Sequence, residues 1–547
     1  MAETIKLTID GKEVEVPKGT PVIRAAIESG AAVPHYCYHP GLTIAGNCRM
    51  CLVEIEKMPK LVTSCTTPAA EGMVVHTRSD KVKEAVAGVE EFLLANHPLD
   101  CPICDQAGEC RLQEYSYKHG NAAGRFREER LQFKKDVAVG PHVILDSERC
   151  IVCTRCVRFC DEITKTGELG VFQRGLHNEI GIFPGRELDN DYSGNVVDIC
   201  PVGALTLKEF RFRKRVWFVR DVPSVCGSCA QGCNVNLGTS ANQIWRLTPR
   251  ENPQVNGWWM CDEGRLSFQG LAKERLAGAG MKEGASHAPV RLHDAAARIA
   301  SALKASGGAS AALASGGLTV EDLWILKRIA SEGAPGLRIV VPERRRGEDD
   351  GFLIRADKTP NRRGAALLGL DIDEGGGATR SLLADAASGK VKTLLALGED
   401  LASLPGGGPA IERLARDGTL LAVGAFVSPT TIAASLSVPS AAYGEFEGTW
   451  VNQAGRAQRV RRAVTPRAEA APVWQILSMV AGHLGVTAGH ASAAEVLREV
   501  AGSVAAFKGL SWKTLGGAGV QVDLGPNAPE PGPAPRGLEA HARVARG

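Results

Sequence analysis

The stretch His97-Pro98-Leu99-Asp100-Cys101-Pro102-Ile103-Cys104-Asp105-Gln106-Ala107-Gly108-Glu109-Cys110 brings one imidazole and three thiols together in a short segment. Its prolines and its glycine interrupt regular structure, so we expect the backbone to turn repeatedly and the four side chains to converge. The pattern predicts a metal site made by His97, Cys101, Cys104 and Cys110. A zinc knuckle uses the same types of ligand, and the spacing alone does not identify the metal.

A second cysteine group has the spacing of a ferredoxin. The run C-x2-C-x2-C-x3-C from Cys150 to Cys160, followed by the distant Cys200-Pro201, is typical of [4Fe–4S] ferredoxins. We therefore predict a [4Fe–4S] cluster that is held by Cys150, Cys153, Cys156 and Cys200. In ferredoxins with two clusters, the fourth cysteine of such a run serves the other cluster. Because only one run is present here, Cys160 is predicted to be a buried free thiol.

The N-terminal segment predicts a β-grasp domain. Residues 3–9 and 13–16 alternate apolar and polar side chains, which indicates a hairpin. A helix is expected next, with Thr20 as its N-cap, Pro21 in its first position and Gly30 at its end. Hairpin followed by helix is the beginning of a β-grasp fold.

Four cysteines fall in this domain: Cys37, Cys48, Cys51 and Cys65. Their spacing differs from the plant-type pattern C-x4-C-x2-C. The loops Tyr36-Cys37-Tyr38-His39-Pro40 and Gly46-Asn47-Cys48-Arg49-Met50-Cys51-Leu52-Val53-Glu54 are nevertheless similar to the [2Fe–2S] β-grasp domain of large redox complexes. A four-thiolate zinc site is the alternative.

The fourth group has four cysteines at wider spacing: Cys226, Cys229, Cys233 and Cys261. Short strands are expected between residues 235 and 247, so this group would lie at the edge of a small β-rich unit. We predict a [4Fe–4S] cluster, with a zinc ribbon as the alternative. The four groups need sixteen ligands, which fifteen cysteines and His97 supply, and Cys160 is the one cysteine left over.

The bulk composition excludes several classes of protein. The 547 residues carry 64 basic and 61 acidic side chains, which gives no reason to expect a nucleic acid or an anionic lipid as partner. There is no signal-peptide pattern and no run of eighteen apolar residues, so we expect neither export nor a membrane span. All 16 cysteines lie between Cys37 and Cys261, and such clustering indicates metal ligation rather than disulfides.

Two other segments have a clear secondary-structure pattern. A helix is expected over residues 79–95, with Ser79 as its cap. Its expected apolar stripe is Val82, Val86, Val89, Phe92 and Leu93. From about residue 285, amphipathic segments such as 292–303 and 320–330 alternate with apolar runs, which predicts a parallel sheet covered by helices.

Two remaining patterns have no predicted ligand. No G-x-G-x-x-G or G-x4-G-K-[ST] motif occurs in the glycine-rich part, so a nucleotide site is unsupported. The basic runs 211–215 and 344–346 are interpreted as solvated faces or subunit contacts.

The chain resembles the large iron–sulfur subunit of bacterial NADH:quinone oxidoreductase, respiratory complex I. The most specific stretches are Asn96 to Cys110, Arg149 to Phe159 and Asp198 to Leu205. The C-terminal part is similar to a molybdopterin oxidoreductase domain, notably from Tyr443 to Arg456. No cysteine follows Cys261, so the usual thiolate ligand of molybdenum is absent and a scaffold without molybdopterin is expected.

The resemblance implies a multidomain α+β and α/β protein. The expected domains are a β-grasp [2Fe–2S] ferredoxin domain (1–78), a [4Fe–4S] domain with one histidine and three cysteine ligands (79–120), a [4Fe–4S] ferredoxin-like domain (140–217), a [4Fe–4S] subdomain of molybdopterin-oxidoreductase type (218–275), a degenerate molybdopterin-oxidoreductase-like α/β domain (276–524) and a disordered tail (525–547). The implied cofactors are one [2Fe–2S] cluster and three [4Fe–4S] clusters, bound by the four groups above.

The resemblance also implies an electron relay without substrate chemistry in this chain. Electrons would come from a flavin-bearing NADH-oxidising subunit to the [2Fe–2S] centre, pass to the Cys150 cluster and then to the His97 cluster, and leave for a two-cluster ferredoxin-like subunit. The Cys226 cluster would lie off this path. The location implied is the peripheral arm of the complex, at the cytoplasmic face of the inner membrane, with membrane contact only through other subunits.

Three other functions remain open at this point. A molybdenum-dependent formate dehydrogenase would share similar N-terminal clusters. The diaphorase-linked subunit of a soluble hydrogenase would share the first three clusters but is expected to lack the long C-terminal domain. A zinc-rich interaction module would have no redox role.

Overall fold

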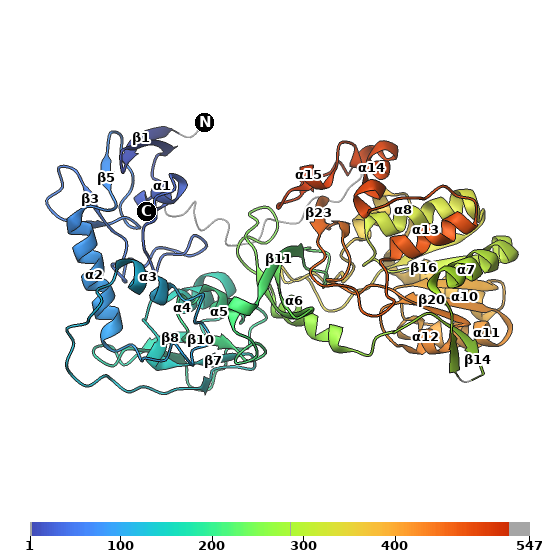
Figure 1. Ribbon diagram of the computed structural model, residues 1–547, viewed down its shortest axis with the longest axis horizontal. Helices are drawn as coiled ribbons and strands as arrows, with labels where there is room; N and C mark the ends of the chain where they lie inside the picture. The colour runs from blue at the N-terminus through green and yellow to red at the C-terminus, as the bar shows by residue number, and fades with distance from the viewer. Residues whose placement is uncertain (1–2, 285, 525–547) are drawn as a thin grey trace. The chain divides into compact units, whose positions relative to one another are not determined.

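The computed structural model describes residues 3–284 and 286–524, and the tail predicted to be disordered lies outside these residues. The chain divides into two compact units at Val219 and Arg220. Figure 1 shows the first unit from blue to green and the second from green to red.

The first unit begins with the predicted hairpin and helix. Strands β1 (Thr4–Ile9) and β2 (Lys12–Pro17) pair antiparallel, and β1 pairs in parallel with β5 (Val74–His76). The sheet order is β2-β1-β5-β3-β4, with β3 at Leu52–Ile55 and β4 at Val62–Thr63. This parallel pairing of the first and last strands around a helix agrees with the expected β-grasp fold.

Helix α1 (Val22–Glu28) begins one residue later than predicted. Pro21, in an extended conformation with ψ 142°, takes the N-cap position, and no side chain caps the helix. The Thr20 hydroxyl instead donates to the Pro17 carbonyl oxygen at 2.7 Å. Gly30 has φ +83°, a left-handed conformation that suits glycine, and the helix ends before it as expected.

Helix α2 (Asp80–Ala95) has the predicted cap, and Val82 and Val86 of the predicted apolar stripe are buried, but the buried face differs toward the end of the helix. The Ser79 hydroxyl oxygen accepts from the Val82 N–H at 3.4 Å, as predicted. Phe92, expected in the apolar stripe, is 84% exposed, whereas Glu90 is fully buried. Glu90 is tolerated inside because its Oε2 accepts from the Tyr36 hydroxyl at 2.7 Å.

Small elements complete the first unit. They are α3 (Arg111–His119), β6 (Val137–Ala138), β7 (Val143–Leu145), α4 (Arg155–Phe159), β8 (Leu169–Phe172), β9 (Glu179–Ile182), α5 (Asn195–Ile199) and β10 (Leu205–Leu207). Strands β10, β7 and β6 form an antiparallel sheet, and β8 pairs with β9. These short strands leave most of residues 96–219 in loops and short helices, and this is where two of the predicted ligand groups lie.

The second unit contains a small sheet and a large one. Strands β11 (Arg220–Val225), β12 (Asn234–Ser240) and β13 (Gln243–Pro249) pair antiparallel, as expected for the region around residues 235–247. The large sheet has the order β15-β14-β21-β20-β19-β16-β17-β18, and its strands from β21 to β18 are parallel. The predicted parallel sheet is therefore confirmed.

The strands of this large sheet are β14 (Gly280–Glu283), β15 (Ser286–Pro289), β16 (Ser310–Ala314), β17 (Arg338–Pro342), β18 (Asp371–Asp373), β19 (Thr393–Leu397), β20 (Thr419–Gly424) and β21 (Leu436–Pro439). The helices of the unit are α6 (Asp262–Leu266), α7 (Leu292–Ser306), α8 (Val320–Arg328), α9 (Arg362–Leu367), α10 (Gly377–Ala387), α11 (Gly407–Asp417), α12 (Pro429–Ala433), α13 (Val473–His483), α14 (Ala493–Ser503) and α15 (Trp512–Leu515). A third sheet has β22 (Gly448–Val451), β23 (Arg456–Val460) and β24 (Val520–Gln521).

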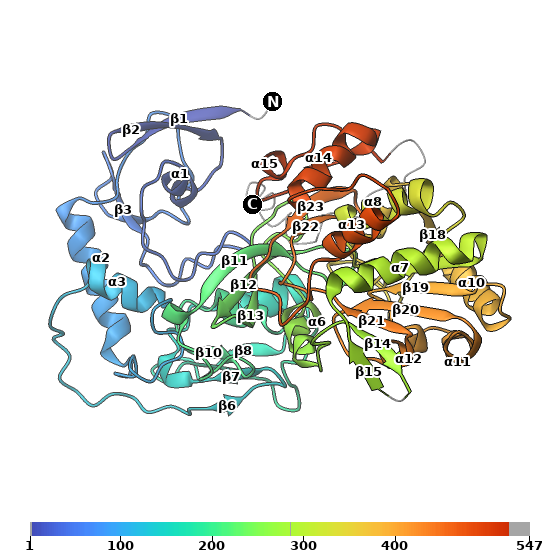
Figure 2. The ribbon, with the colours of Figure 1, turned by 45° about the vertical axis from the view of Figure 1, so that its right-hand side comes forward.

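Helices cover both faces of the large sheet because successive strand residues point in opposite directions. Ala312 and Ala314 of β16 belong to the core that includes α7, α8 and α13, whereas Ala311 and Leu313 belong to the core that includes α10 and α11. Figure 2 shows α7 and α13 on one side of the strands and α11 and α12 on the other. Both faces of the strands are apolar for this reason.

Burial of Glu90 predicts a pH-dependent stability. Burial, opposed by the Tyr36 hydrogen bond, raises the pKa of Glu90 from 4.5 to about 7. A raised carboxyl pKa means that the folded state favours the neutral form, so stability falls as the pH rises from about 4.5 through 7. We compare the free energy of unfolding of Glu90→Gln with that of the unchanged protein. We expect this difference to favour the variant by about 1–3 kcal/mol more at pH 8 than at pH 5.

Chemical denaturation at the two pH values measures this difference. The exposed Glu84 lies on the same helix, and Glu84→Gln is the control, for which no such pH dependence is expected. An equal effect of Glu90→Gln at both pH values would contradict the prediction.

Candidate functional site

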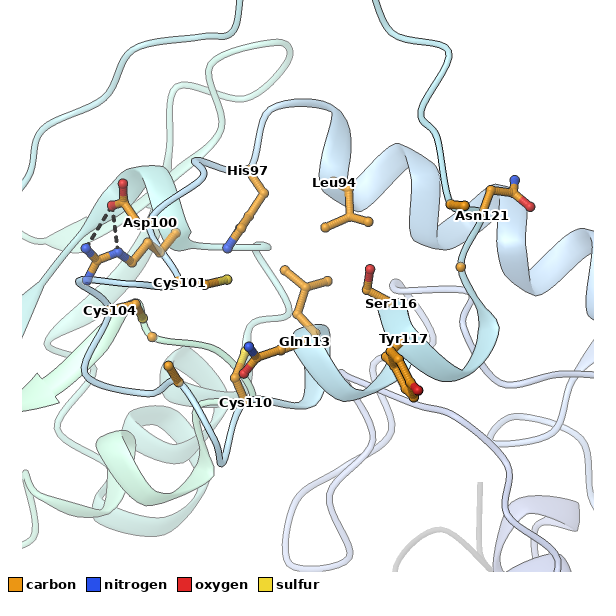
Figure 3. Close-up of a pocket in the computed structure, with 16 residues that line it drawn as sticks. Leu94, His97, Asp100, Cys101, Cys104, Cys110, Gln113, Ser116, Tyr117 and Asn121 are labelled. Carbon is orange, nitrogen blue, oxygen red and sulfur yellow. Dashed lines mark hydrogen bonds and ion pairs between the residues drawn. The ribbon is translucent and has the colours of Figure 1, made fainter. Parts of the chain in front are cut away.

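The predicted ligands His97, Cys101, Cys104 and Cys110 line one cavity of about 510 Å³. His97 follows the end of α2, and Cys110 occupies the N-cap position of α3. Figure 3 shows the four side chains placed around the same space, with Gln113 on its rim. The structure therefore brings this predicted set together.

The loop that carries these ligands is tightly hydrogen-bonded. The Cys104 N–H donates to the Asp100 carbonyl oxygen at 2.6 Å, and Arg130 donates to the His97 carbonyl oxygen at 2.7 Å. Arg215 donates to the Cys104 carbonyl oxygen at 2.6 Å and also contacts the Pro102 carbonyl oxygen. The loop is thus fixed by side chains from well outside it.

Some members of the basic runs, which are interpreted as solvated faces or subunit contacts, also bind acceptors within the chain. Arg215 supports the His97 loop, and Arg211 pairs with Asp136 within the same unit. In the second unit, Arg344 pairs with the buried Glu399 and Arg346 pairs with Glu263. The side chains of Arg345 and Arg346 are 60% and 73% exposed, so this run remains largely solvated although both arginines pair within the chain.

The electrostatics of the cavity suit a neutral histidine. Burial, with Arg149 contributing, lowers the pKa of His97 to about 4, so the imidazole is neutral at pH 7, which is its ligating form. Burial raises the pKa of Cys110 to about 11, while the N–H groups of Gln113 and Leu112 oppose this rise. Backbone donors of this kind favour a thiolate over a thiol.

The ferredoxin-like group also gathers around one space. Cys150, Cys153, Cys156 and Cys200 line a second, smaller pocket. Val152 and Thr154 have φ +49° and +61°, and these left-handed conformations wind the loop tightly before α4 begins. Burial raises the pKa of Cys200 to about 12, and the charge of Cys153 adds to this rise.

Backbone donors face the sulfur of Cys200 as well. The N–H groups of Val202, Leu205 and Ala204 act against the rise in the pKa of this thiol. These donors follow Cys200 directly in the chain, at the end of α5 and the start of β10. The Cys-Pro turn thus supplies both a thiol and the groups that stabilise its anion.

Cys37, Cys48, Cys51 and Cys65 also lie near one another. The Cys37 N–H donates to the Cys48 sulfur at 3.4 Å. A hydrogen bond with Cys51, then burial and the charges of Cys51, Cys37 and Cys48, raise the pKa of Cys65, so all four thiols interact. Gly46 and Arg49, with φ +64° and +57°, shape the loop around them.

The last group lies in the second unit. Cys226, Cys229 and Cys233 occupy the turn between β11 and β12, and Cys261 is the N-cap residue of α6. A Cβ on Gly264 would lie 3.0 Å from the Cys226 sulfur and 3.4 Å from the Cys261 sulfur, so the two sulfurs flank this glycine. All four cysteines are buried.

Cys160 is fully buried, as predicted, and lies in a π-helical turn that follows α4. Burial and the nearby Glu168 raise the pKa of its thiol to about 12. All sixteen cysteines lie in the described part of the chain, and none of them forms a disulfide there. Their thiols are therefore available as ligands, which is the use that the clustering predicts.

Two arginines that sequence reasoning did not identify join the Cys37 group to the Cys150 group. Arg158 donates to the Cys37 carbonyl oxygen at 2.6 Å and to the Cys153 carbonyl oxygen at 3.4 Å. Arg155 contacts the Tyr38 carbonyl oxygen and donates to that of Ile199 at 3.0 Å. Both lie on α4, beside Cys156, and two arginines three residues apart inside a cysteine run are the signal that could have found them.

A glycine makes the corresponding link between the Cys150 group and the His97 group. A Cβ on Gly203 would lie 2.2 Å from the Cys104 sulfur, so only a residue without a side chain fits here. The Arg111 N–H donates to the Pro201 carbonyl oxygen at 3.0 Å in the same segment. The turn that follows Cys200 therefore packs directly on the His97 group.

No three His, Cys, Asp or Glu side chains of the described residues lie close enough together to hold a single metal ion. In an iron–sulfur cluster the thiolates bind different iron atoms, so its ligands need not lie close enough together to hold one ion.

Models of known families match successive parts of the chain. Residues 2–80 match a 2Fe-2S iron-sulfur cluster binding domain, 87–125 the NADH-ubiquinone oxidoreductase-G iron-sulfur binding region, 140–206 the ferredoxin-like domain of NADH-quinone oxidoreductase subunit 3, 219–271 the molybdopterin oxidoreductase Fe4S4 domain and 292–483 molybdopterin oxidoreductase. The chain therefore contains cluster-binding domains of both the 2Fe-2S and the 4Fe-4S type.

Curated relatives extend this similarity. A subunit of NADH-quinone oxidoreductase from Rickettsia bellii is 47% identical over 272 residues, which cover 50% of this chain and 40% of that protein. The mitochondrial 78 kDa subunit of NADH-ubiquinone oxidoreductase from Neurospora crassa is 41% identical over 372 residues, 67% of this chain and 50% of that protein. The chain thus spans half or less of the length of these relatives.

A solved structure of an NAD+-reducing [NiFe]-hydrogenase, in its H2-reduced state, is 30% identical with a TM-score of 0.34. The match covers 39% of this chain and 91% of the hydrogenase chain.

The contact at Gly203 yields a test of the His97 site. Gly203→Ala forces a methyl group onto the Cys104 sulfur, and we expect the purified protein to lose the iron of this one site. Gly88→Ala is the matched control: Gly88 lies in α2 with open space around it, and the change is expected to stabilise the helix by about 1 kcal/mol. Iron analysis and thermal unfolding measure the two outcomes, and unchanged iron content in Gly203→Ala would contradict the proposed packing.

Proposed function

We propose that this chain, a homologue of these NADH-quinone oxidoreductase subunits, is an electron-relay subunit that holds one [2Fe–2S] and three [4Fe–4S] clusters. The observation that carries the proposal is the direct linkage of three ligand groups within the first unit. Arg158 joins the Cys37 group to the Cys150 group, and Gly203 joins the Cys150 group to the His97 group. Adjacent redox centres are the physical requirement of a relay.

The residues present fit the implied clusters. The ligand set of [2Fe–2S] would be Cys37, Cys48, Cys51 and Cys65. The [4Fe–4S] sets would be His97, Cys101, Cys104 and Cys110; Cys150, Cys153, Cys156 and Cys200; and Cys226, Cys229, Cys233 and Cys261. Their thiols are mostly buried, interact with one another and receive backbone N–H groups, which are features that stabilise and tune iron–sulfur centres.

The chemistry that such clusters supply is one-electron transfer. This chain's own residues keep water out, neutralise thiolate charge and fix the spacing of the sites. We propose that electrons enter at the Cys37 group, pass the Cys150 group and leave from the His97 group. The exposure of Cys101 supports the His97 group as the point where electrons leave, because the other cysteine ligands are buried or only partly exposed.

The Cys226 group lies in the second unit, whereas the three linked groups lie in the first. We propose that its cluster takes no part in the main path. The large parallel sheet would serve as a scaffold, because the chain has no cysteine after Cys261 to bind molybdenum.

The proposed partners follow from the same similarity. They are a flavin-bearing NADH-oxidising subunit, a two-cluster ferredoxin-like subunit and other subunits of a peripheral arm at the cytoplasmic face of the membrane. In the described part of the chain, no helix combines the length and the apolar character that crossing a membrane requires.

Metal analysis and electron paramagnetic resonance test the function as a whole. Anaerobically purified protein is expected to contain iron and sulfide for four clusters and to show reduced-cluster signals after dithionite. Stoichiometric molybdenum with a pterin would favour a formate dehydrogenase-like enzyme instead. Several zinc atoms per chain with no resonance signal would replace the relay by a zinc-binding module.

Two variants test the histidine ligand. His97→Cys is expected to retain a cluster with a lower midpoint potential, because a thiolate adds a negative charge that disfavours reduction. His97→Ala is expected to weaken or lose the cluster. A redox titration followed by resonance measures both, and unchanged midpoints in both variants would show that His97 is not a ligand.

A further inference from the structure

Arg149 is a buried cation at the wall of the His97 cavity. Its side chain is 4% exposed, and it lines the cavity together with His97, Cys104 and Gly203. Cys150, a ligand of the neighbouring group, follows it directly in the chain. Arg149 thus lies at the junction of two candidate cluster sites.

Two of the three guanidinium nitrogens of Arg149 donate hydrogen bonds to one carboxylate. Nε and Nη2 donate to the same Oδ2 of Asp100, at 3.0 and 2.8 Å, and Figure 3 marks these bonds at Asp100. Nε also lies 3.3 Å from Asp146. Asp100 precedes the ligand Cys101, so the ion pair joins the backbone beside one ligand to the backbone beside another.

The third nitrogen, Nη1, is buried and has no partner. A buried, unpaired N–H of a charged group costs free energy unless an acceptor is supplied. The Cys104 sulfur is the nearby candidate, because the Cβ position of Gly203 lies 2.2 Å from this sulfur and 3.7 Å from Arg149 Cδ. A thiolate or sulfide in the cavity is the kind of acceptor that this nitrogen lacks.

Around Arg149, the three carboxylates of Asp100, Asp146 and Glu148 outnumber the two cations Arg149 and Lys135. Lys135 binds Asp100, Asp146 and Glu148, so the carboxylates near Arg149 are shared with a second, more exposed cation. His97, on the other side of the cavity, is neutral as a ligand. Within this network, Arg149 is the cation that lines the cavity beside Cys104.

We infer that Arg149 donates from Nη1 to the thiolate or sulfide side of the His97 cluster and raises the midpoint potential of that cluster. The inference rests on the proposed function, because it requires a cluster at this site. Reduction adds one negative charge to a cluster, and a fixed cation with an N–H donor stabilises the reduced form more than the oxidised form. This would favour delivery of electrons to the His97 site.

Two variants that break the same ion pair separate this role from a structural one. Arg149→Met removes a positive charge and is expected to shift the midpoint of the His97 cluster downward. Asp100→Asn removes a negative charge next to the same cluster and is expected to shift it upward. A loop that is merely loosened would respond to both changes in the same direction.

The measurement is a redox titration of the full chain, purified anaerobically and followed by electron paramagnetic resonance. The [2Fe–2S] signal is the internal reference and is expected to stay unchanged. Arg149→Lys keeps the charge without the planar fork, and its midpoint is expected between those of the unchanged protein and Arg149→Met. If Arg149→Met does not retain the cluster, the opposite signs expected for Asp100→Asn and Arg149→Lys decide the question.

Midpoints that stay unchanged, or shifts of one sign in all variants, would overturn the inference. This result differs from failure of the proposed function, in which the unchanged protein would itself show no cluster signal from the His97 site.

Discussion

The first unit buries many thiols close to one another, and this is the constraint on which its structure depends. A thiolate taken out of water is costly unless donors or cations face it. The chain supplies backbone N–H groups from the turns after Cys110 and Cys200, and arginines from α4 and from Arg149 and Arg215. Even Arg155, whose pKa burial lowers to about 10, remains charged at neutral pH. Short helices and irregular loops carry these groups.

The same arginines also determine how the ligand groups are spaced. Arg155 and Arg158 extend from one helical turn to carbonyl oxygens of the Cys37 loop, so the charge that compensates one site also fixes its neighbour. Gly203 permits a closer approach between the Cys150 group and the His97 group than a residue with a side chain would. Spacing and electrostatic compensation are thus produced by a few residues that each contact two groups.

The second unit shows a different physical basis. Its large sheet is apolar on both faces and is held by helices on each side, so its stability comes from packing of side chains such as those of β16. Its cysteine group sits in the turn between β11 and β12 and at the start of α6, outside the parallel strands. This separation agrees with the proposal that the sheet is a scaffold.

The sequence by itself determined the four ligand groups as spacing patterns, the hairpin and helix of the β-grasp domain, the cap of α2 and the parallel sheet. These features depend on neighbouring residues and on regular periodicity, which a linear chain displays. Only the tertiary structure decided that Glu90 is buried while Phe92 is exposed, because the partner of Glu90 is Tyr36, 54 positions earlier. It also decided which atoms Arg149, Arg158, Arg215 and Gly203 contact, since each of these atoms lies far away in the chain or in another loop. The spacing of Arg155 and Arg158 inside the cysteine run is a local signal, but the acceptors of these long-range contacts cannot be read from the sequence.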